Sequence, residues 1–162
     1  MTTTKKSLLV VGIVLVLIQF IRPHRNISST LTANDITLQY KVPDTVLTLL
    51  KRSCYDCHSN NTVYPWYDRV QPVAWWLQYH VNHGKHDLNF SEFGSYTSEK
   101  QVKKLKSIGE AAREGWMPLD SYLWMHGYAR LSPGEATLIA GWADSLRSQA
   151  GAADKAGRQA GK

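Results

Sequence analysis

Cys54-Tyr55-Asp56-Cys57-His58 contains both cysteines of the chain and decides what the surrounding sequence folds around. The pattern C-x-x-C-H is the attachment signature of c-type haem. Two thiols about one helical turn apart can each add to one of the two vinyl groups on a porphyrin edge. The imidazole next to the second thiol then presents a nitrogen to the iron. The stretch therefore predicts one covalent haem c, attached at Cys54 and Cys57, with His58 as the proximal iron ligand.

Three other uses of a cysteine pair stay open at this point. A dithiol redox centre favours a βαβ context, and the sequence shows no alternation of strands with helices. A structural zinc site needs four ligands, commonly from two separated pairs, and the chain has no second cysteine pair. A plain disulfide would leave His58 without a role. Haem attachment is the interpretation that uses all three side chains.

The positive charge of the chain lies at its two ends. Of the net charge of +6 over 162 residues, residues 1–25 carry +4 and residues 151–162 carry +2. Residues 26–150 balance 12 basic against 12 acidic side chains. Charge of this kind does not form a binding face for phosphates, so we expect no nucleic-acid partner.

One local cluster departs from that balance. Lys100, Lys103, Lys104 and Lys106 fall within a single predicted helix. Two interpretations remain, a solvated helix face or a docking patch that attracts an acidic redox partner in a salt-dependent way.

An apolar stretch near the N-terminus predicts a membrane anchor. Residues 7–21 read SLLVVGIVLVLIQFI and follow Lys5 and Lys6. As a helix they would span about 22 Å, short of the roughly 30 Å hydrocarbon core, which suits a short anchor or a signal peptide. Residues 22–25 read RPHR and offer no small-x-small cleavage site. We therefore expect an uncleaved transmembrane helix, with a cleaved signal as the alternative.

The sequence divides into five parts on this basis. These are a short N-terminal segment at 1–6, the anchor at 7–21, a polar tether at 22–43, a haem-binding domain at 44–150 and a disordered, Gly/Ala/Lys-rich tail at 151–162. Covalent c-type haem is installed outside the cytoplasmic membrane. We therefore expect a single-pass protein of the bacterial inner membrane whose C-terminal domain faces the periplasm.

Helical periodicity and capping signals predict an all-α domain. The first expected helix begins with Asp44 as N-cap and has Leu47, Leu50 and Cys54 on one face. The second begins at Pro72 and ends at Gly84, before a loop over 86–94, and the third begins at Thr97 or Ser98 and ends at Gly115. A short fourth helix covers 119–127, and the fifth begins at the capping box Ser132-Pro133-Gly134-Glu135 and ends near Gln149. The expected architecture is a small cytochrome c-like helical domain around one haem, with an N-terminal transmembrane helix.

Longer motifs extend the attachment signature. The sequence reads CYDCHSN at 54–60, YPWY at 64–67, NFS at 89–91 and GWMP at 115–118. From about Lys41 to Ala150 the chain thereby resembles the bacterial c-type haem-binding domain family. The resemblance implies haem directly and electron transfer by analogy.

Two positions depart from the pattern of this family. Phe93 stands where a tryptophan is usual, and Lys85 stands where an arginine is usual. Neither position belongs to the attachment motif. The lysine would weaken a bidentate contact to a carboxylate or haem propionate.

Met117 is the predicted sixth ligand of the iron. Gly115 ends a helix and Pro118 stiffens the following backbone, so the methionine between them is held on a rigid turn. The Met-Pro pair resembles the arrangement that carries the axial methionine in typical small cytochromes c. His126 and His80 are the alternative ligands.

These features together predict a membrane-tethered monohaem cytochrome that carries electrons and is not an enzyme. Its expected partners are redox proteins of the periplasm or membrane, such as a respiratory or photosynthetic complex. A haem-based sensor or a peroxidase-like haem enzyme is the alternative, and either would need an open position on the iron. No catalytic residues are predicted.

Overall fold

The computed structural model describes residues 2–28 and 30–160, and every regular element in these residues is helical. The predicted all-α class is confirmed. The elements, in chain order, are α1 (Thr3–Leu17), η1 (Ile18–Phe20), α2 (Ile36–Gln39), α3 (Asp44–Ser53), α4 (Tyr55–His58), η2 (Trp66–Arg69), α5 (Val73–Asp87), η3 (Phe90–Ser95), α6 (Ser98–Glu114), α7 (Asp120–Leu123), η4 (Gly127–Ala129) and α8 (Pro133–Ala160).

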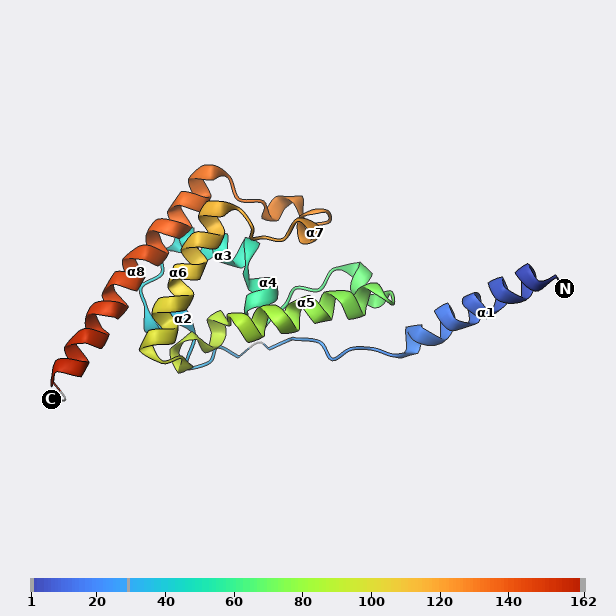
Figure 1. Ribbon diagram of the computed structural model, residues 1–162, viewed down its shortest axis with the longest axis horizontal. Helices are drawn as coiled ribbons and strands as arrows, with labels where there is room; N and C mark the ends of the chain where they lie inside the picture. The colour runs from blue at the N-terminus through green and yellow to red at the C-terminus, as the bar shows by residue number, and fades with distance from the viewer. Residues whose placement is uncertain (1, 29, 161–162) are drawn as a thin grey trace.

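The N-terminal helix projects away from the other elements (Figure 1). Helix α1 and η1 together give a stretch, Thr3–Phe20, that is long and apolar enough to cross a membrane, with a mean hydropathy of 1.7. None of this stretch is buried by the rest of the chain. The helix begins inside the segment predicted at 1–6, of which Met1 lies outside the described residues.

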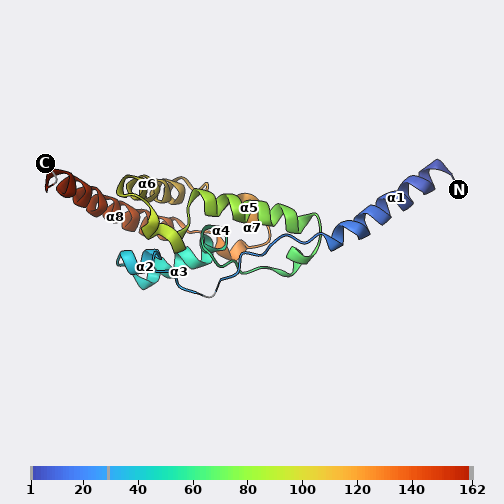
Figure 2. The same cartoon turned by 90° about the horizontal axis from the view of Figure 1, so that it is seen from below.

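The core of the domain lies where two long helices meet the first part of the chain. Helices α6 and α8 run side by side in both views (Figures 1 and 2), and α3 packs on α8. The largest fully buried side chains of this core include Phe90 and Phe93 of η3, Ile36 of α2, Leu50 of α3, Leu105 of α6 and Ile139 of α8. The buried face of α6 includes Leu105, Ile108 and Ala112.

Local capping chemistry fixes three helix ends as predicted. The side chain of Thr97 accepts a hydrogen bond from the Lys100 amide at the start of α6. Gly115 ends that helix in the left-handed conformation, with φ of 72°, which glycine adopts without steric cost. Ser132 and Glu135 form the reciprocal capping box that opens α8.

The start of α3 differs from the prediction. Pro43 occupies the N-cap position, and Asp44 is the first helical residue, with no side-chain cap. The carboxylate of Asp44 instead lies in the first turn, where it is favoured by the helix dipole. The buried face includes Val46 and Leu49, while Leu47 is only half-buried.

Gly84 does not end a helix, so that prediction is wrong. Helix α5 continues through Gly84 to Asp87, and the Leu88 amide donates to the Gly84 carbonyl oxygen over 2.9 Å. The predicted loop over 86–94 therefore begins later and contains η3. A glycine in a helix can serve close packing as well as termination, and here it serves packing against Cys57.

Residues 22–43, predicted as a polar tether, pack along the domain. Arg25 forms an ion pair with Asp68, and the Asn34 carbonyl oxygen accepts from the Gly94 amide over 2.8 Å. Ile36 in α2 is fully buried in the core. Ser29, within the predicted tether, lies outside the described residues.

The C-terminal helix runs past the predicted boundary. Helix α8 continues to Ala160, whereas the sequence predicted a helix end near Gln149 and a disordered tail from Gly151. The added segment is rich in alanine with lysine, arginine and glutamine, residues of high helix propensity, which offsets its glycines. Residues 161–162 of the predicted tail lie outside the described residues.

Candidate functional site

The two cysteines and the histidine of the motif are displayed from a single turn of helix. Cys54 breaks α3 with φ of −129°, and α4 follows at once. The amides of Cys57 and His58 both donate to the Cys54 carbonyl oxygen, over 3.2 and 3.0 Å. Both thiols are free and half-buried. The turn therefore presents two thiols and one imidazole together, as attachment of a porphyrin requires.

The imidazole of His58 is oriented by a backbone carbonyl. Its Nδ1 lies 3.0 Å from the Leu88 carbonyl oxygen, so Nδ1 carries the proton and Nε2 keeps its lone pair. Burial lowers the pKa of His58, with hydrogen bonding to backbone acting in the opposite direction. The ring is thus held as the neutral tautomer that ligates a metal, with the outer hydrogen bond typical of metal-bound histidines.

Burial also sets the state of the thiols in the chain without cofactor. It raises the pKa of Cys54 to about 12, with a smaller contribution from Cys57. It raises the pKa of Cys57 to about 11, helped by the charge of Asp56. Both groups are therefore protonated in neutral water, and a protonated thiol is a poor nucleophile.

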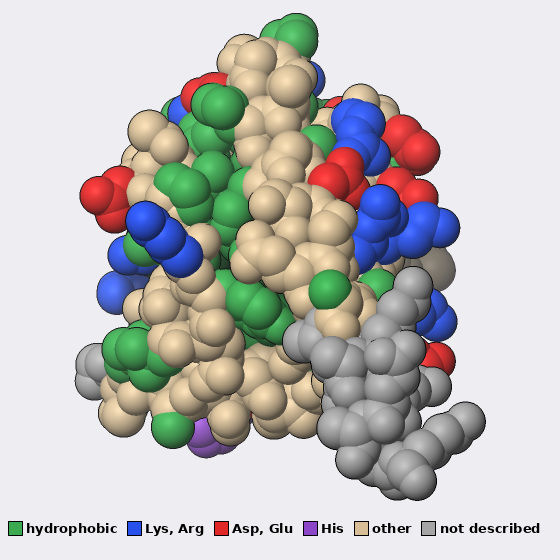
Figure 3. Space-filling model, turned by 90° about the vertical axis from the view of Figure 1, so that its left-hand side faces the viewer, with side chains coloured by type: hydrophobic (Ala, Val, Ile, Leu, Met, Phe, Trp, Pro, Cys, Tyr) green, Lys and Arg blue, Asp and Glu red, His purple; other side chains and the backbone are tan. Residues whose placement is uncertain are grey.

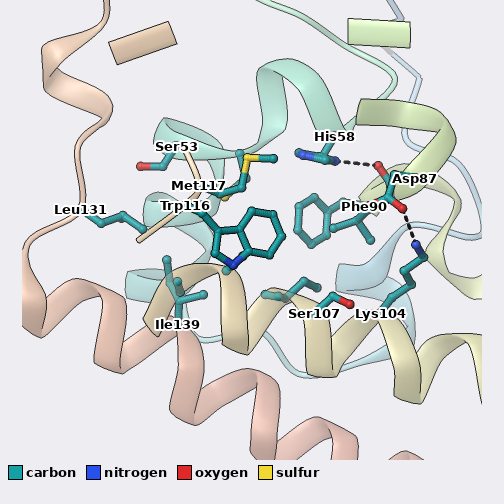
Figure 4. A pocket seen from close by; sticks show the side chains of 15 residues that line it. Ser53, His58, Asp87, Phe90, Lys104, Ser107, Trp116, Met117, Leu131 and Ile139 are labelled. Atoms are coloured by element: carbon teal, nitrogen blue, oxygen red, sulfur yellow. Dashed lines mark hydrogen bonds and ion pairs between the residues drawn. The ribbon is translucent and has the colours of Figure 1, made fainter. Parts of the chain in front are cut away.

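The motif opens onto two adjoining cavities. Their volumes are about 620 Å³ and about 810 Å³, counting the space open to solvent. Both are lined by Ser53, Cys54, His58, Asp87 and Met117. The first cavity, drawn in Figure 4, is completed mainly by apolar side chains, among them Phe90, Ile108, Trp116, Leu131 and Ile139.

Met117 and His58, the predicted axial ligands, line the same two cavities. Met117 follows the left-handed Gly115 at the end of α6 and is half-buried against both cavities. Figure 4 shows both side chains at the first cavity. The assignment of Met117 as iron ligand stays a prediction.

The two alternative ligands are placed differently. His80 lines the second cavity with His83, and its Nδ1 lies 2.8 Å from the Trp76 carbonyl oxygen. His126 lines neither cavity. It is buried, stacks on Tyr122 at 4.1 Å between ring centroids, and hydrogen-bonds with the Tyr67 hydroxyl. Of the predicted alternatives, only His80 lies at the site.

No group of three or more His, Cys, Asp or Glu side chains is arranged to hold a metal ion in the part of the chain that the structure describes. Charged side chains do border the first cavity. Lys104 donates to Asp87 over 2.7 Å at its edge. This lysine is one of the clustered lysines of α6, and two others are engaged, Lys100 over the Tyr96 ring and Lys106 with Glu110.

Asp56 links the turn that carries the motif, residues 54–58 (hereafter the attachment turn), to the rest of the domain through hydrogen bonds. Its carboxylate accepts from the Tyr122 hydroxyl over 2.7 Å and from the Val63 amide over 3.1 Å. Its carbonyl oxygen accepts from the Thr62 hydroxyl over 2.6 Å. Burial, followed by the hydrogen bond to the Asp56 carboxylate, raises the pKa of Tyr122. Sequence reasoning assigned no role to Asp56, because both side-chain partners are identified only by the fold.

Asn26 performs a similar task from the N-terminal segment. Its side chain donates to the Ser59 carbonyl oxygen and to the Thr62 hydroxyl, each over 2.9 Å. Its side-chain oxygen accepts from Lys85 over 2.5 Å, so the lysine noted as a departure from the family pattern contacts Asn26 and lines neither cavity. Its own amide donates to the Tyr64 hydroxyl. The loop after the motif is thus held by a residue that precedes the motif.

The donor set at the cavities fits a haem. Two thiols on one turn match the two reactive vinyl groups, a neutral imidazole is held beside them, and the walls are largely apolar. A family model described as a haem-binding domain matches residues 13–145.

The chain belongs to the haem-binding domain family. The match begins inside α1 and includes residues 22–43, so it extends further toward the N-terminus than the resemblance seen from about Lys41. No match was found among curated proteins or among solved structures. Membership of this family supports haem binding by the chain.

Proposed function

We propose that this haem-binding domain is a membrane-tethered monohaem c-type cytochrome that carries electrons between periplasmic or membrane redox partners. The observation that carries the proposal is the convergence of Cys54, Cys57, His58 and Met117 on one pair of cavities. Two attachment residues and two candidate axial ligands then serve one cofactor. The single C-x-x-C-H motif corresponds to a single haem c.

Each residue of the set has a distinct task. Cys54 and Cys57 hold the porphyrin edge through thioether bonds, and His58 offers Nε2 to the iron while Leu88 fixes its tautomer. Met117 would be the second protein ligand of the iron. When bound, the haem supplies a one-electron couple between ferric and ferrous iron.

The apolar walls favour electron transfer over catalysis. Ile108, Leu131 and Ile139 would shield a bound haem from water, which would tune its reduction potential. A sensor or a peroxidase-like enzyme would instead need an open or displaceable position on the iron. Met117 at the cavity supports a closed iron.

The surroundings of the domain follow from the anchor and the attachment chemistry. Helix α1 and η1 would cross the bacterial inner membrane once, with the haem domain on the periplasmic side. The partners would be redox proteins there, such as a membrane-bound respiratory or photosynthetic complex. The exposed lysines of the α6 cluster, Lys100, Lys103 and Lys106, would be the surface where an acidic partner docks, while Lys104 is paired with Asp87 at the cavity.

Absorption spectra of the full chain, produced in a bacterium with the c-type maturation system, test the proposal. We expect a low-spin haem in both oxidation states that survives acid-acetone extraction and does not bind carbon monoxide at neutral pH. Complete extraction of the haem would overturn covalent attachment. Rapid, stoichiometric carbon monoxide binding to the reduced protein would replace electron transfer with the sensor or enzyme alternative.

A further inference from the structure

The end of the membrane helix is fastened directly to the haem domain. The Gln71 amide donates to the Gln19 side-chain oxygen over 2.9 Å, and the Gln19 side chain donates back to the Gln71 carbonyl oxygen over 3.3 Å. The Ile21 carbonyl oxygen accepts from the Gln71 side chain over 3.0 Å and from the Trp75 indole over 2.9 Å. The start of α5 is therefore held at the end of the apolar helix.

Cationic side chains gather at the same junction. Arg22 donates to the Arg69 carbonyl oxygen over 2.6 Å, and Arg25 donates to Asp68 over 2.8 Å through Nε. Arg22, Arg25 and Arg69 are all exposed, although the charge of Arg25 is offset by Asp68. Cations directly beyond an apolar helix lie where anionic lipid headgroups would meet them.

A groove lined by exposed aromatic side chains lies beside this junction. It has a volume of about 1060 Å³, counting open space, and runs between η2, the start of α5 and α7. Its exposed apolar residues, hereafter the aromatic groove, are Trp66, Val73, Trp76, Leu119, Trp124 and Met125. Trp66 and Trp124 keep 75% and 81% of their surface exposed.

The position of the aromatic groove agrees with a lipid-facing surface. Trp66 and Val73 bracket Gln71, the residue bonded to the membrane helix, so part of the groove lies at the exit of that helix. Exposed tryptophans in water are costly, but the indole ring is favoured at the boundary between hydrocarbon and headgroups. The opposite end of the molecule, which Figure 3 shows, carries Lys, Arg, Asp and Glu side chains toward its edges, with hydrophobic side chains between them.

We propose that the aromatic groove rests in the headgroup region of the bilayer that α1 enters, so that the haem domain lies on the membrane surface. The occupant is the lipid bilayer itself, with anionic headgroups meeting Arg22 and Arg69. This proposal rests on the proposed insertion of α1 in the membrane. Contact of the domain with the bilayer goes beyond the insertion of α1, because an inserted helix alone would allow the domain to lie away from the lipid.

The groove also reaches the haem site. Cys57, His80, Leu119 and Tyr122 line both the aromatic groove and the second of the two site cavities. A domain resting on this groove therefore turns the attachment residue Cys57 toward the bilayer and leaves the lysines of α6 elsewhere on its surface.

Fluorine NMR of the full chain in lipid nanodiscs tests the proposal. The six tryptophans are labelled with 5-fluorotryptophan and assigned by single Trp→Phe variants. Spectra of the reduced haem protein are compared with and without a lipid that carries a gadolinium chelate on its headgroup. We expect selective broadening of Trp66, Trp76 and Trp124, while Trp142, buried on α8, keeps its intensity.

A paired variant separates lipid contact from folding. In W66S/W124S, with the haem spectrum unchanged, Trp76 should lose its broadening because the domain is no longer held on the lipid. The matched control Leu138→Ser, at an exposed apolar residue of α8 that lines neither the groove nor the two site cavities, should leave Trp76 broadened. Equal effects on all tryptophans, or none on the three of the groove, would overturn the proposal.

An alkaline carbonate wash of membranes distinguishes the two levels of failure. Release of the protein would overturn both the membrane anchor and the surface contact. Retention of the protein together with sharp resonances for Trp66, Trp76 and Trp124 would leave the anchor standing and overturn the surface contact alone.

Discussion

Gly84 of α5 lies so close to Cys57 that a methyl group at Gly84 would meet the Cys57 carbonyl oxygen at 2.6 Å and its Cβ at 3.0 Å. The nearer atom belongs to the backbone, so it cannot turn aside as a flexible side chain would. The missing side chain at Gly84 therefore sets how closely α5 approaches the attachment turn. The same approach brings the Leu88 carbonyl oxygen within reach of His58.

Gly84→Ala should destabilise the protein by about 1–3 kcal/mol, because the added methyl forces α5 away from Cys57. This is opposite in sign to the gain of about 1 kcal/mol expected for alanine in an unobstructed helix. Gly141→Ala in α8, where no atom outside the helix lies within 4 Å of the new Cβ, is the matched control and should show that gain. Denaturant unfolding of the holoprotein measures both, and equal stability of the two variants would contradict the packing argument.

Met117→Ala should open the iron to carbon monoxide, and Met117→His should keep a low-spin haem with a lower reduction potential. Met125→Ala is the control, since Met125 is exposed and lines the aromatic groove rather than the site cavities. Carbon monoxide titration and redox titration measure these effects. An unchanged ferric spectrum and potential in Met117→Ala would remove Met117 from the iron, with His80 next to test.

Cys54→Ala and Cys57→Ala should each remove one thioether bond, and the double variant should retain no covalent haem. Haem staining after denaturing electrophoresis, with the mass of the intact chain, gives the readout. Haem that stays attached in the double variant would show that attachment uses other residues.

The apoprotein should be alkylated slowly at both cysteines. The thiolate is the reactive form, and the pKa values of about 11 and about 12 leave little of it at pH 8. At that pH iodoacetamide should react at least about 100-fold more slowly than with the unfolded chain, whose thiols have a pKa near 8.5.

The pH dependence of apoprotein stability follows from the same shift. The pKa values of both thiols are higher in the folded chain than in the unfolded chain. Below the pKa of the unfolded thiols, both groups are therefore protonated and the contribution of their burial to the free energy of unfolding is fully present. It is lost as pH rises through about 9 toward 11 and 12. The variant with both cysteines replaced by alanine should not show this loss of stability between about pH 9 and pH 12. Fast alkylation of the folded chain at pH 8 would contradict the burial of the thiols.

Much of the fold could be predicted because its signals are local. The cap at Thr97, the glycine ending at Gly115 and the box at Ser132 each depend on neighbours within a few residues. Gly84 was misinterpreted because a helical glycine signals either an end or a close approach, and only the distant Cys57 decides between them. The packing of residues 22–43 depends on partners far along the chain, which leave no periodic pattern.

The candidate site follows the same division. The attachment turn and Met117 were visible as short motifs. The carbonyl oxygen of Leu88 was not, since any residue offers one and only the bend after α5 places it beside His58. His126 was an alternative iron ligand in the sequence, but in the structure it stacks on Tyr122 and hydrogen-bonds with the Tyr67 hydroxyl.

The hydrogen bonds of Asn26 and Gln19 bear on how this protein could be divided or fused. The covalent order places both residues on the anchor side, but their bonds belong to the domain that carries the motif. A chain shortened to begin at Ser28 would lose Asn26 and the Arg25–Asp68 pair, and with them the support of the loop after His58. The separable unit therefore begins before Gln19, and any exchange of the N-terminal apolar helix for another has to leave its last turn in place.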